Sequence, residues 1–466
     1  MDPTIWTDEF LDRMRLKGDR EGDDAVHCLY HDVLDSPEVF HRINALLCQL
    51  TFEGELDISK LPGPVRRFAE DSAKLPSWCD PELVDEGQQL FFANGFAATA
   101  LLMCASLPEC YVMRNGVQVL GLTAYLSKRP KMRILETSQM VGDVMTPGYL
   151  KPDGKGILAA QKVRLLHAAV RHLILEASAA EDHHDDMVCR YAKVQWDYAR
   201  WGHPICQEDM AYTLQTFAYV VVRGMDDLGV KMTPRQKEAY IHCWNVTGHI
   251  MGLQRDLIPE PQPGDTHTRW ELAGALYRTI RKRQEGRTKP GTDLTAALIG
   301  VMQEVIGIEV EKTRVLKHIG ARRLKLLPPF LMLHLLGQPT LAYLGVDLPK
   351  TTRFERFLTR CALRLTKWSE GKYQRFLSHM TFRRASIRLH ELITRHLSTL
   401  PPGHKQQFLP EHVRRVVKAT GQRPSEVLSA RLESEAESPK DSVARVRRGR
   451  ARPHPAKPPE KEIGSD

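Results

Sequence analysis

The sequence lacks the patterns that mark several large classes of cofactor-dependent enzyme. It contains no P-loop and no Gly-rich dinucleotide fingerprint, which argues against nucleotide-binding enzymes of those two types. None of its nine cysteines forms a CxxC pair, which argues against Cys-rich zinc sites and c-type haem attachment. The odd number and the scattered positions of the cysteines indicate reduced thiols, so we expect a cytoplasmic protein.

Signals for secretion and for membrane insertion are also weak. The first ten residues, MDPTIWTDEF, are acidic and have no apolar core segment, so no signal peptide is expected. Residues 88–108 carry no charge but include glutamine, asparagine and threonine, which favours a buried core helix over a membrane span. Prolines interrupt residues 324–346 and indicate short packed helices, with an apolar face suited to peripheral membrane contact.

Helical periodicity dominates the rest of the chain. Hydrophobic residues make up 42% of it and charged residues 26%, which is typical of a soluble protein with a large core. We predict an all-α fold, a large globin-like helical bundle. Helices are predicted at about 81–106, 110–127, 131–145, 155–182, 207–228, 234–256, 266–283 and 292–306.

The same patterns divide the chain into four parts. A helical extension (1–80) precedes the central helical domain (81–350), which a second helical region (351–435) and a basic tail (436–466) follow. The tail carries much of the net charge of +9 and is rich in proline, so it is predicted to be disordered. It has no aromatic residues on which bases could stack, and we therefore expect no specific nucleic-acid partner.

Two apparent metal motifs do not have the required spacing. In HELITRH, His390 and His396 are six residues apart, whereas a zinc-protease helix needs histidines four apart. EDHH at residues 181–184 supplies one Glu-x-x-His step, and a di-iron bundle needs two. We interpret EDHH as a solvated cluster at a helix end.

Two motifs on predicted helices combine residues suited to a flat, dianionic cofactor. In RILET, Arg133 and Thr137 share a face and Glu136 lies beside them; in RLLH, Arg164 precedes His167, which lies at the edge of an apolar stripe. The residues alone leave two interpretations. His167 is either a hydrogen-bonded core histidine or a metal ligand, with arginines pairing carboxylates and Thr137 and Glu136 lining the open side.

Further motifs follow in a defined order. RILET and RLLH precede GHPICQEDM (202–210), WNVTGHIMG (244–252) and HLLGQPTLAYLG (334–345). In this order they resemble the haem-b oxygenase family that includes latex-clearing protein and MpaB, over about residues 85–350.

The resemblance implies haem b as the cofactor and a haem-binding, oxygenase-like catalytic domain at residues 81–350. It implies that His167 is the iron ligand, and that Arg133, Arg164 and Thr137 line or support the haem pocket. Glu136 would then act as a general base or proton relay. The implied substrates are dioxygen and a small hydrophobic alkene or isoprenoid-like molecule. Two alternatives remain: a non-catalytic haem-binding or gas-sensing protein, and a helical scaffold without cofactor.

The sequence departs from the rubber-cleaving members of that family. They carry a lysine at the position of Glu136, and a pocket glutamate farther upstream, whereas residues 111–133 contain no acid here. Rubber cleavage is therefore not expected. His249 is interpreted either as a residue that supports the site residues from behind or as a packing residue, and His242 as a surface residue; neither is expected to be a ligand. The sequence does not define an oligomeric state.

Overall fold

The computed structural model describes residues 6–31, 62–122, 130–152, 154–179, 196–312 and 326–347. Within these ranges the chain is helical, apart from turns and an isolated β-bridge between Met113 and Glu285. The all-α prediction is confirmed. The predicted C-terminal helical region, the basic tail, EDHH and HELITRH lie outside the described residues.

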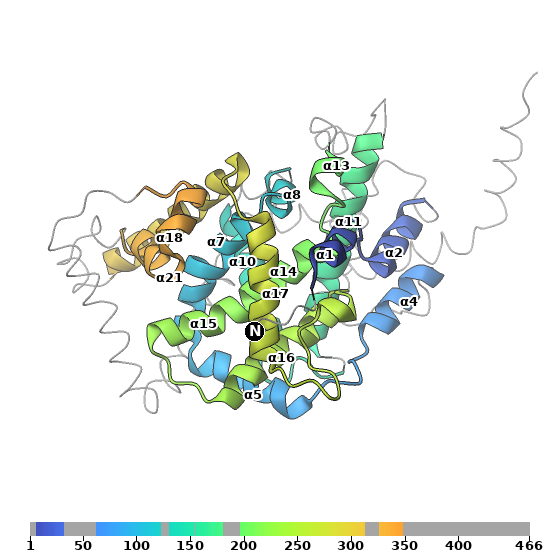
Figure 1. Ribbon diagram of the computed structural model, residues 1–466, viewed down its shortest axis with the longest axis horizontal. Helices are drawn as coiled ribbons and strands as arrows, with labels where there is room; N and C mark the ends of the chain where they lie inside the picture. Colours follow the sequence, from blue (N-terminus) through green and yellow to red (C-terminus); the bar gives the residue numbers. More distant parts are fainter. Residues whose placement is uncertain are drawn as a thin grey trace, which may run out of the picture.

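The helices of the described part follow one another along the chain as drawn in Figure 1. They are α1 (Asp8–Arg15), α2 (Arg20–His31), α4 (Gly63–Ser72), α5 (Pro81–Ala93), α6 (Gly95–Leu101), η2 (Leu102–Ser106), α7 (Leu107–Tyr111), α8 (Gly116–Leu122), α10 (Pro130–Met145), α11 (Lys155–Ala179), α13 (Tyr198–Trp201), α14 (Gln207–Phe217), α15 (Tyr219–Leu228), α16 (Pro234–Ile250), η3 (Arg255–Leu257), α17 (Arg269–Gln284), α18 (Lys289–Lys312) and α21 (Leu327–Leu344).

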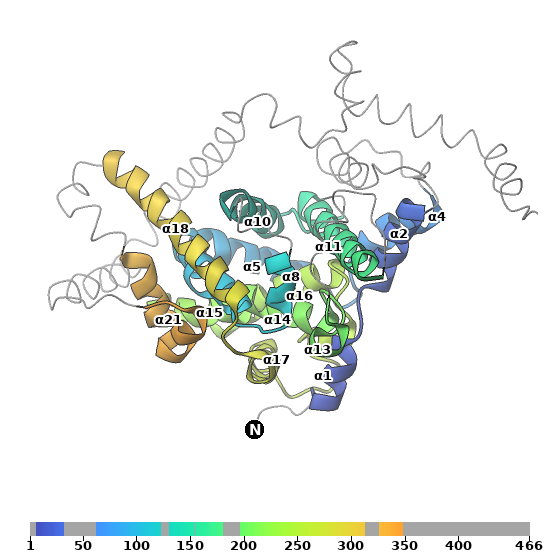
Figure 2. The ribbon, with the colours of Figure 1, turned by 90° about the horizontal axis from the view of Figure 1, so that it is seen from above.

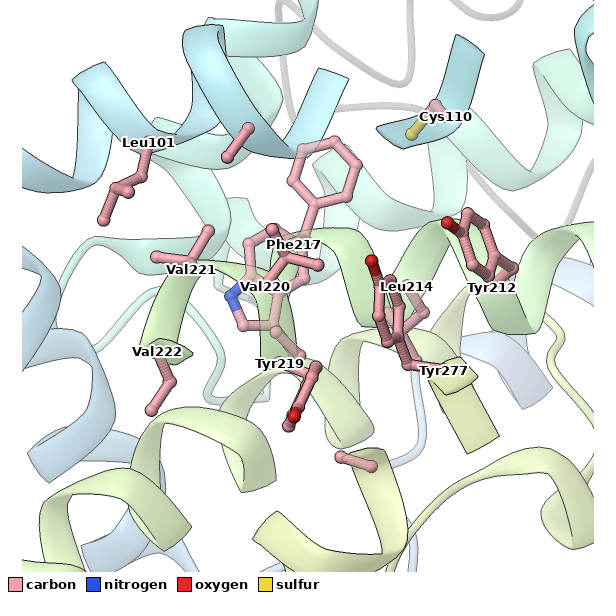
Figure 3. Packing of buried hydrophobic residues seen from close by; sticks show 14 of the residues in the cluster. Leu101, Cys110, Tyr212, Leu214, Phe217, Tyr219, Val220, Val221, Val222 and Tyr277 are labelled. Atoms are coloured by element: carbon pink, nitrogen blue, oxygen red, sulfur yellow. The ribbon is translucent and has the colours of Figure 1, made fainter. Parts of the chain in front are cut away.

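The core is built around α14, which other helices surround. Ten of its eleven residues are buried, as expected for a helix that has no solvent-facing side. Aromatic rings fill the space between α14, α15 and α17: the ring centroids of Tyr212 and Tyr277 lie 5.4 Å apart, and those of Tyr219 and Tyr277 lie 5.3 Å apart. Figure 3 shows these rings beside the valines of α15. Trp6 and Leu11 near the N-terminus belong to the same core cluster.

The predicted helix at 81–106 begins as expected but is broken. Asp80 caps it, because its carboxylate accepts hydrogen bonds from the backbone N–H groups of Glu82 and Leu83, and Pro81 follows the cap. Asn94, with φ −118° and ψ 28°, then ends α5. The segments Pro81–Ala93 and Ala97–Tyr111 meet at 86°.

None of the single helices in the described ranges has both the length and the apolar composition of a membrane span. The bent pair formed by Pro81–Ala93 and Ala97–Tyr111 meets those two criteria when it is taken together. Many side chains of this pair, including Leu90, Phe91 and Leu101, are buried in the protein core.

A tight connection turns the chain from α10 into α11. The backbone N–H of Gly156 donates to the carbonyl of Tyr149 at 2.9 Å. A Cβ at Gly156 would lie 2.9 Å from the carbonyl oxygens of Asp143 and Tyr149, so this position requires glycine. The two helices pack against each other and lie on one side of the molecule in Figure 2. This arrangement places RILET and RLLH on neighbouring helices.

Candidate functional site

His167 lies on an apolar, half-buried face of α11. Val163, Leu166 and Val170 are spaced so that they share this face with the imidazole, and all four side chains are partly exposed. The opposite side of the helix is buried and carries Leu165. One side of α11 is thus buried in the protein, and the other side is apolar and partly exposed. A further apolar group could pack against this second side.

The C-terminal end of this face is bordered by α8 and by residues 196–205. Val170 packs against a small cluster made of Val119, Ile174 and Trp196. The indole N–H of Trp196 donates to the carbonyl of Gly202 at 2.8 Å, which fixes the ring in that cluster. The face that carries His167 is therefore closed at this end by ordered side chains.

The RILET motif lies within α10. Ile134 is buried in the core and Thr137 is partly exposed. Arg133 and Glu136 belong to the same helix, but their side chains lie outside the described residues. The structure thus places the two motifs on neighbouring helices that contact each other. The individual roles of Arg133, Glu136 and Thr137 stay predictions.

Arg164 binds protein groups on the buried side of α11. Its Nε and Nη2 atoms donate to the two carboxylate oxygens of Asp19, each at 2.7 Å, and Nη2 also donates to Glu21 at 2.7 Å. Nη1 donates to the carbonyl of Ile250 at 3.4 Å. Both side chains of the Arg164–Asp19 pair are nearly inaccessible, with 6% and 4% exposed.

These contacts decide what Arg164 can do. Four of the five N–H donors of a guanidinium are engaged by protein acceptors. The geometry does not support the predicted direct pairing of Arg164 with a cofactor carboxylate. The geometry fits the other predicted role, in which Arg164 supports the helix. The bidentate pair with Asp19 fixes the rotation of α11 and with it the side on which His167 lies.

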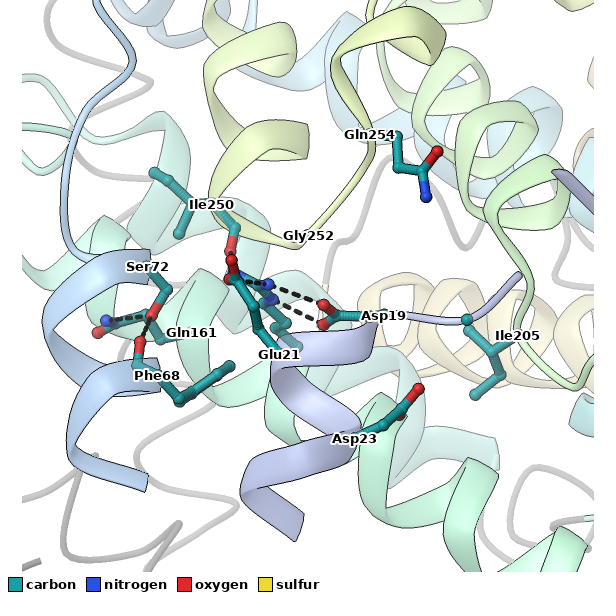
Figure 4. A network of polar contacts seen from close by, with 12 residues as sticks. Asp19, Glu21, Asp23, Phe68, Ser72, Gln161, Ile205, Ile250, Gly252 and Gln254 are labelled. Atoms are coloured by element: carbon teal, nitrogen blue, oxygen red, sulfur yellow. Dashed lines mark hydrogen bonds and ion pairs between the residues drawn. The ribbon is translucent and has the colours of Figure 1, made fainter. Parts of the chain in front are cut away.

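Two further polar groups anchor the same side of α11, and Figure 4 shows one of them, Gln161, beside Ser72. Arg171, which is 1% exposed, donates through Nε to Asp23 at 2.7 Å. Burial raises the pKa of Asp23 even though the charge of Arg171 acts to lower it. Gln161 donates to the hydroxyl of Ser72 at 2.8 Å, which links α11 to α4. The buried side of α11 is therefore held by hydrogen bonds to α2 and α4.

Comparison with known proteins identifies the family. Residues 87–368 match the family described as "ER-bound oxygenase mpaB/B'/Rubber oxygenase, catalytic domain". This match covers more than half of the chain and includes both motifs. The chain belongs to this oxygenase family. The resemblance inferred from the motifs is confirmed at the level of the family.

Two relatives of this oxygenase family show how far the similarity extends. The "Rubber oxygenase" of Streptomyces sp. (strain K30) is 29% identical over 285 residues, which is 59% of this chain and 61% of that protein. The chain thus spans about three fifths of that relative. The solved "Structure of Latex Clearing Protein LCP in the closed state" aligns with a TM-score of 0.58 at 25% identity, covering 77% of this chain and 84% of the other.

Some of the residues that anchor α11 precede the segment matched to the family. Asp19, Glu21 and Asp23 belong to α2 or its immediate start, whereas the match begins at residue 87. The N-terminal helices therefore contribute the carboxylates that anchor α11. The sequence offered no signal for these partners, because they lie well over a hundred residues from the arginines that they bind.

The prediction that His242 lies on the surface is wrong. Its ring is fully buried, with Nδ1 3.0 Å from Glu260 and with Nε2 accepting a hydrogen bond from the backbone N–H of Asp80 at 2.9 Å. Burial acts to raise the pKa of Glu260, but hydrogen bonds from His242 and Arg269 lower it. Sequence reasoning missed this network because Glu260 lies in a loop beyond α16.

His249 behaves as predicted for a packing residue. Its ring meets Trp78 edge to face, with the ring centroids 6.0 Å apart. Burial, together with the charge of Arg164, lowers the pKa of His249. The imidazole thus lies close enough to the anchored side of α11 for the charge of Arg164 to act on it.

A buried acid in the GHPICQEDM motif was also missed. Burial, reinforced by the neighbouring Glu208, raises the pKa of Asp209 to about 7. The amide of Gln284 donates to Asp209 at 3.4 Å, and Arg283 donates to Glu208 at 3.0 Å. The signal in the sequence was the pair of adjacent acids at the start of a helix that is otherwise suited to the core.

Proposed function

We propose that this protein is a haem-b-dependent oxygenase that uses dioxygen to oxidise a small hydrophobic molecule. The proposal rests chiefly on His167. Its imidazole lies on a half-buried apolar face of an anchored helix, within the segment that matches an oxygenase catalytic domain.

The residues on this face fit a haem group. A porphyrin is flat and apolar, and Val163, Leu166 and Val170 provide aliphatic surface on both sides of the imidazole. The His167 imidazole would hold the haem iron through a ring nitrogen. When bound, haem supplies the capacity to bind and activate dioxygen.

The rest of the chain holds this ligand in place. The Arg164–Asp19 pair lies one turn before His167 and on the buried side of α11, so it limits rotation of the helix about its axis. The apolar side chains around the imidazole would exclude water and leave an open side for an apolar substrate. Thr137 and Arg133 on α10 are proposed to line that side or to pair the haem carboxylates.

Glu136 is proposed as the proton acceptor on the open side. A carboxylate in an apolar pocket has a raised pKa, which suits a general base that works near neutral pH. Glu136→Gln should keep haem binding but lower turnover by roughly 10²-fold or more. Steady-state oxygen consumption checks this, and wild-type turnover in the Gln variant would remove Glu136 from the mechanism.

The substrate class is proposed to be an alkene or an isoprenoid-like molecule. Purified, haem-loaded protein should consume oxygen with an unsaturated hydrocarbon and not with the saturated hydrocarbon of equal length. Equal rates with both, or no consumption with a panel of alkenes, would count against an alkene oxygenase. The cytoplasmic location and a peripheral membrane contact stay predictions.

A further inference from the structure

A charged pocket lies outside the helices that carry RILET and RLLH. Its volume is about 310 Å³, and it lies among α7, α15, α17 and α21. Among the described residues, none from α10 or α11 lines it. A pocket of this size accommodates a small molecule and is too small to enclose a porphyrin.

Basic side chains outnumber acidic ones around this pocket. Arg223, Arg278, Arg281 and Lys282 face two carboxylates, those of Glu109 and Glu285, so the lining carries four positive charges against two negative charges. Its net charge of +2 favours an anion.

The two carboxylates are already engaged by one of these cations. Nε of Arg281 donates to Glu109 at 3.0 Å, and Nη1 donates to Glu285 at 2.6 Å. Glu109 is almost completely buried and also accepts a hydrogen bond from the hydroxyl of Tyr212 at 2.9 Å. Arg281 thus binds both acids but balances only one of their two charges, and the other three cations make the lining positive overall.

Arg223 has a different environment. Among the described residues, no carboxylate lies within 4.0 Å of its guanidinium, although the side chain is half-buried. The guanidinium carbon lies 5.5 Å from the ring centroid of Tyr277 and 5.9 Å from that of Tyr219. Aromatic rings stabilise the cation through its faces, and the Tyr277 side chain and the charge of Glu109 also act on it. A guanidinium has five N–H donors, so donors that Tyr277 does not use can serve a ligand.

We propose that this pocket binds a small oxyanion with two negative charges, either a phosphate group or a dicarboxylate. Arg223 would donate to the oxyanion, and Lys282 at the rim would add a second charge. Planar or tetrahedral oxygen arrays match the forked donors of arginine. Leu335 and Leu336 on α21 form an apolar wall that suits the carbon portion of such a ligand. This site goes beyond the proposed oxygenase site and does not depend on haem.

Isothermal titration of the full-length protein with inorganic phosphate, and separately with succinate, tests the proposal at constant ionic strength. At least one probe should bind at a single saturable site. Saturation by phosphate alone assigns the site to a phosphoryl group, and saturation by succinate alone assigns it to a dicarboxylate. If neither probe saturates, the proposal is wrong.

Two charge-reversal variants distinguish binding in this pocket from a general effect of the protein's charge on anion binding. Lys282 is exposed, so Lys282→Glu should fold normally, and it should weaken binding by about tenfold or more. Arg200→Glu makes the same change of charge at an exposed residue of α13 outside the pocket, and binding should stay within about twofold. Equal weakening in both variants would overturn the proposal, because it would show a general charge effect.

Discussion

At the scale of single residues, Arg164 shows how a motif residue can hold its own helix in place through contacts within the protein. The resemblance placed Arg164 at the haem pocket, and its charge suggested the haem carboxylates as partners. In the structure two acidic residues engage it instead, and both side chains of the Arg164–Asp19 pair are buried. The sequence could predict that Arg164 matters, but it could not predict a partner 145 residues away.

Arg164→Ala should lower the free energy of unfolding by about 3 kcal/mol or more, because it leaves the carboxylate of Asp19 buried without its main partner. Urea denaturation measures the loss. The control is Arg20→Ala, which removes an exposed arginine from a surface pair with Asp24 and should change stability by only about 0.5 kcal/mol. If the two variants lose the same amount, Arg164 is not a structural brace.

Asp209 leads to a prediction about pH. Burial raises its pKa from 3.8 to about 7, so the folded state holds a proton that the unfolded state releases. Stability from this group is present below about pH 4 and is lost as the pH rises towards 7, with a slope of about 1.4 kcal/mol per pH unit. Asp209→Asn cannot ionise. Its stability relative to that of the wild type should therefore increase between pH 5 and 7 in urea denaturation, and a constant difference would contradict the raised pKa.

Helix pairs depend on glycine at the points where backbones approach closely. A Cβ at Gly87 of α5 would lie 2.5 Å from the carbonyl oxygen of Ala239 in α16, and backbone atoms cannot move aside independently. Gly87→Ala should therefore destabilise the protein by about 1–3 kcal/mol, despite the better helix propensity of alanine.

Gly300 in α18 provides the matched control for Gly87. It lies in a helix too, but a Cβ there would meet no atom within 4 Å. Gly300→Ala should stabilise the protein by up to about 1 kcal/mol, since only the propensity term remains. Thermal unfolding of both variants measures whether stability falls in Gly87→Ala and rises in Gly300→Ala. A gain of stability in Gly87→Ala would contradict the close approach of α5 and α16, and a loss in Gly300→Ala would contradict the open surroundings of Gly300.

At the scale of elements, the sequence predicted most helices but not their interruptions. Caps such as Asp80–Pro81 are encoded locally, so the start of α5 was predicted correctly. The break at Ala218, where the prediction had one helix over 207–228, has no proline or glycine to mark it. Such a break is set by packing against other helices, which periodicity along a single segment does not report.

For the whole molecule, family membership and helical architecture were predictable because the motifs are ordered along the chain. The sequence did not predict that the N-terminal helices anchor a helix of the segment matched to the family. The family match begins at residue 87, yet α2 and its start supply the carboxylates that fix α11. A separate pocket with a surplus of positive charge, formed by α7, α15, α17 and α21, was also outside the reach of sequence patterns.

The central claim is that His167 is the haem ligand, and the haem content of purified protein tests it most directly. Wild-type protein should show a Soret band with one haem per chain. His167→Ala should lose that haem while its far-ultraviolet circular dichroism stays helical. His172→Ala, which removes another partly buried imidazole five residues along the same helix, should retain it. Full haem content and an unchanged Soret band in His167→Ala would contradict the account.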